Sequence, residues 1–199
     1  VRPSPWAPTG ATLHEALALL EADAVGSQGR KPLFHCSISP PEGEAPLTED
    51  EWARTWRIYE EAHNLTGHKF VEVFHYKKRD GSNEPSEHRH RVYSRVVPDL
   101  EIGATPRLVN MSFTHIKNEY AMAQARLEMG RPFIPGAHGA TVAKWAREAG
   151  NEALEEYVSS APSVTRKGTI SIEAHQSAQK AGRSAKNDYE YIYNSWSFA

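Results

Sequence analysis

Two strand-like segments that flank a turn-forming stretch constrain the fold of this 199-residue chain more than any other feature. Residues 69–77 and 88–96 are both rich in β-branched and aromatic side chains. Residues 79–86 between them contain Gly, Ser, Asn and Pro, which are typical of turns. The pattern predicts an antiparallel hairpin with a long loop.

Three histidines share one face of this predicted hairpin. Side chains alternate along a strand, so His75 shares a face with Val71 and Val73, and His88 shares a face with His90. A register that places His75 opposite or diagonal to His90 brings the three imidazoles together. Because neutral imidazole is a common metal ligand, we expect His75, His88 and His90 to bind a divalent metal. The alternative is that they are partly exposed sheet residues.

The charge of the chain is unevenly distributed. The formal net charge is −2, which argues against a protein coated with nucleic-acid-binding residues. Residues 75–95 nevertheless carry six basic side chains against three acidic ones, and a local track of this kind attracts phosphate groups. Tyr76 and Tyr93 are either stacking platforms for bases or packing residues of the sheet.

Composition limits the class of protein. The chain is 39% hydrophobic and 24% charged, as is usual for a globular domain, and it contains neither a membrane-length apolar run nor a signal-peptide pattern. Its single cysteine, Cys36, excludes an internal disulfide, so we expect a cytoplasmic protein. Cys36 alternates with Phe34 and Ile38, which indicates a buried strand face and a structural thiol.

Local signals predict helices around the hairpin. Thr12 with Glu15, and Thr48 with Glu51, have capping-box spacing, which predicts helices over residues 12–24 and 48–64. A strand is expected over residues 33–39, and a helix over 114–129 that ends at Gly130. Further helices are expected over 140–159 and 173–187, with a linker over 160–172. The predicted fold class is α+β, with a central antiparallel sheet flanked by helices and a helical C-terminal extension.

Four segments of the sequence together resemble a known family. They are residues 31–40 (Lys-Pro-Leu-Phe-His-Cys-Ser-Ile-Ser-Pro), residues 47–61, the strand that contains His75, and residues 87–96 (Glu-His-Arg-His-Arg-Val-Tyr-Ser-Arg-Val). The match spans roughly residues 11–130 and resembles the nuclease domain of plasmid mobilisation relaxases, the HUH endonucleases of the MobA and VirD type. We therefore interpret residues 1–130 as a relaxase-like nuclease domain. Residues 131–199 are then a helical extension and tail, or the start of a further domain.

The resemblance implies a metal-dependent nicking enzyme. In this family three histidines hold Mg²⁺ or Mn²⁺, which polarises the scissile phosphate of single-stranded origin-of-transfer DNA, and a tyrosine attacks to leave a 5′-phosphotyrosine. The expected partners are single-stranded DNA or an origin hairpin, together with accessory mobilisation proteins. We expect Lys77, Arg91 and Arg95 to contact the DNA, and Glu87 to orient a ligand histidine.

The nucleophile departs from the family pattern. Relaxases carry it near the N-terminus, yet residues 1–58 contain no tyrosine. Tyr120 on the predicted helix 114–129 is the candidate replacement, although it also belongs to an apolar stripe that would pack on the sheet. His14 and His35 are further candidates without positive support. Two other functions stay open: a relaxase-fold module that binds DNA without cleaving it, and a metallohydrolase that uses an activated water.

Overall fold

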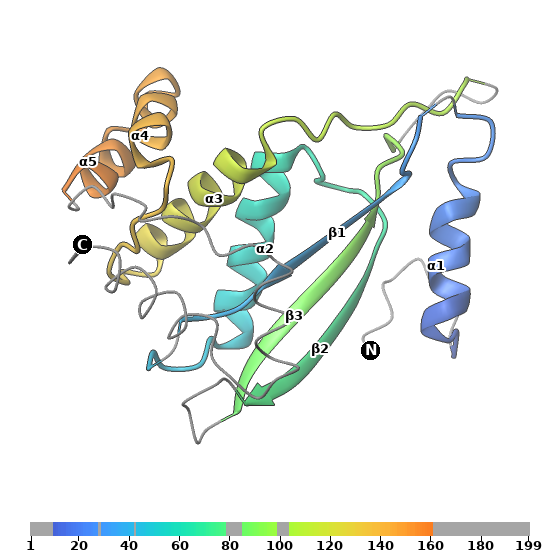
Figure 1. The fold of residues 1–199 in the computed structure, drawn as a ribbon, viewed down its shortest axis with the longest axis horizontal. Helices are drawn as coiled ribbons and strands as arrows, with labels where there is room; N and C mark the ends of the chain where they lie inside the picture. Colours follow the sequence, from blue (N-terminus) through green and yellow to red (C-terminus); the bar gives the residue numbers. More distant parts are fainter. Residues whose placement is uncertain (1–9, 28, 42, 79–84, 99–103, 161–199) are drawn as a thin grey trace, which may run out of the picture. The chain divides into compact units, whose positions relative to one another are not determined.

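The computed structural model describes residues 10–27, 29–41, 43–78, 85–98 and 104–160. In this part of the chain a three-stranded antiparallel sheet is combined with five helices (Figure 1), which confirms the α+β class. The elements in chain order are α1 (Leu13–Ala22), β1 (Leu33–Ile38), α2 (Glu49–His63), β2 (Phe70–Lys78), β3 (Pro85–Ser94), α3 (Thr114–Glu128), α4 (Gly139–Glu148) and α5 (Glu152–Ser159). The predicted helix over 173–187 and the linker from residue 161 onward lie outside the described residues.

Both predicted capping boxes are present. The hydroxyl of Thr12 accepts a hydrogen bond from the backbone N–H of Glu15, whose carboxylate accepts one from the N–H of Thr12. Thr48 and Glu51 repeat this arrangement at the start of α2. These reciprocal bonds satisfy N–H groups that have no partner within the helix, so they fix where each helix begins.

The strand order of the sheet is β1-β3-β2, so β3 lies in the centre. In the β2–β3 pair His75 is opposite His88 and Val73 is opposite His90, which places His75 diagonal to His90 as predicted. In the β1–β3 pair Ser37 is opposite His90. All three strands are antiparallel to their neighbours. The side chains of directly paired residues on adjacent strands therefore point to the same face of the sheet.

Different helices cover the two faces of the sheet. On one face α2 packs its buried Trp52 and Trp56 in a core that also contains Cys36 and Tyr93. On the other face α1 packs Leu20 and Ala16 against Val71 of β2. Val71 lies near the start of β2, so α1 covers the end of this face away from His75 and His88. Figure 1 shows α1 separated from α2 by the strands.

The helix α3 packs against α2 on one side and against α4 and α5 on the other. Ala121 and Ala125 belong to the core with α2, whereas Ala123 belongs to a second core with α4 and α5. The stripe that contains Tyr120 and Leu127 faces this second core. Our expectation that the stripe packs on the sheet is therefore wrong. The described residues do not test the predicted domain boundary at residue 130.

None of the helices in the described part of the chain is long and apolar enough to cross a membrane.

Candidate metal centre

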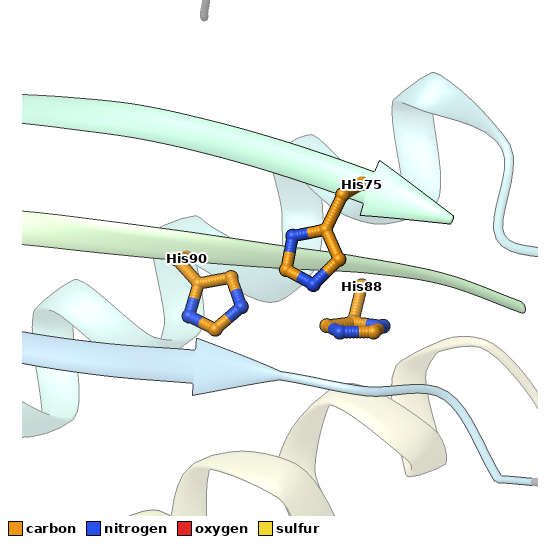
Figure 2. A group of neighbouring side chains, drawn as sticks. All are labelled: His75, His88 and His90. Atoms are coloured by element: carbon orange, nitrogen blue, oxygen red, sulfur yellow. The ribbon is translucent and has the colours of Figure 1, made fainter. Parts of the chain in front are cut away.

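His75, His88 and His90 converge at one end of the sheet. Each offers a ring nitrogen, and these nitrogens lie within 4.8 Å of one another. Figure 2 shows the three rings directed toward a common space, with His75 on β2 and the other two on β3. Two nitrogens bound to one ion at about 2.1 Å lie roughly 3 to 4 Å apart. Modest rotations of the rings therefore suffice to hold a single metal ion.

The strand register produces this convergence. His75 and His88 are directly paired across β2 and β3, and their ring centroids are 4.0 Å apart. His90 follows two residues later on the same face, with its centroid 5.0 Å from that of His75. His75 is exposed, while His88 and His90 are half-buried. The site is thus held by backbone pairing on one side and open to solvent on the other.

His90 has a ring nitrogen that suits a metal. Its Nε2 atom is buried and has no hydrogen-bond partner among the described residues. Burial lowers the pKa of His90, and the neighbouring His35, His75 and His88 lower it further. A lowered pKa keeps the imidazole neutral at pH 7, and only the neutral ring has a lone pair to donate to a metal. The residues present therefore fit a divalent cation.

A fourth histidine, His35, contacts this cluster from β1. Its Nε2 atom lies 3.0 Å from Nδ1 of His90, and the two rings are stacked with centroids 5.2 Å apart. From the sequence we considered His35 only as a nucleophile. Strand alternation within residues 33–39 was visible, but the pairing of β1 with β3 joins residues about 55 positions apart and leaves no local signal.

Two of the three basic residues expected to contact DNA lie away from the histidines. Arg91 belongs to the face covered by α2, where it donates hydrogen bonds to Glu60 at 2.8 Å and Glu72 at 2.7 Å. Arg95 donates to the backbone carbonyls of Lys31 and Val109, and burial lowers its pKa. We therefore assign neither arginine to a substrate at the histidines.

Lys77 alternates onto the histidine face in the register of β2, but its side chain lies outside the described residues. Its expected contact with DNA stays a prediction.

Glu87 and the candidate tyrosines are also turned away from the histidines. Glu87 accepts hydrogen bonds from Arg89 and Tyr76 on the α2 face, so it does not orient a ligand histidine. Tyr93 is fully buried on that face. Tyr120 packs with α4 and α5, on the side of the sheet opposite the histidines. Within the described residues no tyrosine lies on the histidine face.

Comparison with models of protein families, with curated proteins and with solved structures finds no match. The resemblance to mobilisation relaxases therefore rests on the motif residues of the chain itself.

Proposed function

We propose that this chain is a metal-dependent nuclease domain that acts on a phosphodiester of single-stranded DNA, as the mobilisation relaxases do. The observation that carries the proposal is the convergence of three imidazole nitrogens within 4.8 Å on the face of the sheet where the His75 side chain is exposed. The motif Glu87-His-Arg-His-Arg-Val-Tyr-Ser-Arg-Val96, which resembles the relaxase signature, provides two of these imidazoles.

His75, His88 and His90 would hold the cation. A divalent metal bound there supplies Lewis-acid polarisation of a phosphate oxygen. Three protein ligands leave coordination positions for that oxygen. Between the two metals that the resemblance implies, three nitrogen donors favour Mn²⁺, because Mg²⁺ prefers oxygen ligands.

A second candidate function is hydrolysis by an activated water. The observation that favours it is the position of the tyrosines: Tyr93 and Tyr120, among the described residues, lie on the opposite side of the sheet from the histidines. Tyr120→Phe is expected to leave cleavage unchanged under either function. A loss of cleavage in that variant, with the Mn²⁺ affinity intact, would restore Tyr120 as the nucleophile.

The first experiment measures the affinity of the chain for Mn²⁺ by titration calorimetry. We expect the double variant His88→Ala, His90→Ala to bind at least about 100-fold more weakly than the parent, because ligand losses exceed the effects of outer-shell changes. The matched control is His14→Ala, His115→Ala, which removes two exposed imidazoles outside the cluster. Equal affinity in the parent and the histidine-face variant would contradict the metal site.

The second experiment distinguishes the functions. The parent is incubated with Mn²⁺ and an end-labelled mixed-sequence single-stranded oligonucleotide, and the products are separated under denaturing conditions. A covalent protein–DNA adduct supports the relaxase function, and cleavage without an adduct supports the hydrolase. A mobility shift without cleavage supports the binding module instead of either enzyme.

A further inference from the structure

His35 contacts His90 but is not one of the three clustered histidines. His35 lies on β1, the strand that pairs with β3 on the side away from β2. We propose that His35 is a positioning residue that accepts a hydrogen bond from Nδ1–H of His90 and thereby presents the Nε2 lone pair of His90 to the metal. The proposal rests on the metal site proposed above.

The two nitrogens of His90 have different surroundings. Nδ1 lies 3.0 Å from Nε2 of His35, whereas Nε2 is buried without a hydrogen-bond partner among the described residues. In Figure 2 one ring nitrogen of His90 is turned toward His75 and His88, and the other toward β1. A neutral imidazole carries one N–H and one lone pair, so the partner of one nitrogen decides the state of the other.

Only one of the two tautomers suits a metal. If Nδ1 of His90 carries the hydrogen and donates it to His35, Nε2 keeps a lone pair directed at the cluster. The opposite tautomer places an N–H group there, where it has no acceptor and blocks coordination. Ligand histidines generally bind an outer partner through their second nitrogen for this reason.

His35 acts through His90 and not as a fourth ligand. The nitrogens that lie within 4.8 Å of one another belong to His75, His88 and His90. The Nε2 atom of His35 is engaged by the opposite edge of the His90 ring. His35 is also exposed and does not belong to a hydrophobic core of the described residues, so its substitution leaves the packing of the sheet intact.

Two substitutions separate the hydrogen bond from the ring stacking. His35→Gln retains an acceptor near the position of Nε2 but removes the ring, whereas His35→Phe retains a stacked ring but removes the acceptor. We expect Mn²⁺ affinity, measured by calorimetry, to fall by about 10- to 100-fold in His35→Phe and to stay within about 3-fold of the parent in His35→Gln. The reverse order would show that stacking matters instead, and would overturn the proposal.

The tautomer can be observed without metal. Nitrogen NMR of the ring atoms, at a pH above the imidazole range, is expected to show His90 as the Nδ1–H tautomer in the parent and in His35→Gln. In His35→Phe the population of the Nε2–H tautomer should rise. Finding the Nε2–H tautomer in the parent would overturn the proposal directly.

The two measurements also separate the proposals from each other. A parent that does not bind Mn²⁺ contradicts the metal site and, with it, the role of His35. If the parent binds Mn²⁺ and His35→Phe binds it with equal affinity, only the role of His35 is contradicted. The proposed metal site is then unaffected.

Discussion

The two faces of the sheet carry ionisable side chains in very different surroundings. On the histidine face, imidazoles from three strands lie half-buried or exposed, and the Nε2 atom of His90 has no partner among the described residues. On the α2 face, Arg89 and Arg91 lie beneath the helix, stacked on Trp52 and Trp56 at 4.5 and 4.3 Å. The same strands therefore provide a partly exposed histidine cluster on one side and a covered charged network on the other.

The charges on the α2 face are paired within the protein. Arg89 contacts Glu49 and Glu87, and Arg91 contacts Glu60 and Glu72. A guanidinium stays charged when it is buried, so it requires nearby carboxylates, and its flat surface suits an indole ring. An excess of basic residues in the sequence of a strand is thus weak evidence for a DNA-binding surface, because every second side chain points to the other face of the sheet.

The largest effect that we expect comes from breaking the covered network. Arg91→Met leaves the largely buried carboxylate of Glu60 without the Arg91 cation and leaves the buried carboxylate of Glu72 with only an ion pair to Arg89 at 3.8 Å. The free energy of unfolding should therefore fall by about 3 to 5 kcal/mol. Urea denaturation measures the loss. The control Arg57→Met removes half-exposed surface ion pairs with Glu61 and Glu128 and should cost less than about 1 kcal/mol.

A variant that also removes the two carboxylates tests the cause of this loss. Combining Arg91→Met with Glu60→Gln and Glu72→Gln removes the two carboxylates that Arg91 contacts and should recover most of the lost stability. If the single variant loses no more stability than Arg57→Met, the network on the α2 face contributes little, and the contrast between the two faces disappears.

A smaller effect is expected from metal binding on the histidine face. At a free Mn²⁺ concentration 100 times Kd, a site formed only in the folded state raises the free energy of unfolding by about 2.7 kcal/mol. His88→Ala should lose this increment, whereas a destabilised but folded Arg91→Met protein should keep it. Denaturation curves with and without Mn²⁺ measure both. Loss of the increment in Arg91→Met would show that the two faces are coupled.

Sequence reasoning reached the parts of the site that are local in the chain. The helix starts follow from capping residues three positions apart, and the shared face of His88 and His90 follows from alternation. The diagonal placement of His75 needed only the hairpin, whose strands are adjacent in sequence. These features depend on residues that are close in the sequence or joined by one turn. They could therefore be predicted from the sequence alone.

The parts that sequence reasoning missed depend on distant pairing. His35 reaches His90 only because β1 pairs with β3, a choice that alternation within β1 does not reveal. The carboxylate partners of Arg91 lie on α2 and β2, and Tyr120 faces α4 and α5 instead of the sheet. In each case the side-chain environment is set by which elements pack together, and the periodicity of one segment does not determine that.

The smallest effect that we expect is a pH dependence from a histidine on the covered side. His63 at the end of α2 is fully buried, stacks on Tyr59 and places Nδ1 2.9 Å from the Tyr59 carbonyl oxygen. Burial lowers its pKa, so the unfolded chain takes up a proton at a higher pH than the folded protein does. Stability should be unaffected by this group above the unfolded pKa of about 6.5 and should fall as the pH drops from there toward the folded value.

His63→Phe keeps an aromatic ring at this position but cannot take up a proton. Urea denaturation of metal-free protein at a series of pH values should therefore show that the free energy of unfolding falls less with decreasing pH in His63→Phe than in the parent. His115→Phe, which replaces an exposed histidine on α3, is the matched control. Because His90 on the opposite face also has a lowered pKa, part of the fall at acid pH should persist in His63→Phe. If the free energy of unfolding falls equally at acid pH in His63→Phe and in the parent, its pH dependence comes from groups other than His63. This buried histidine then does not contribute to the difference between the two faces.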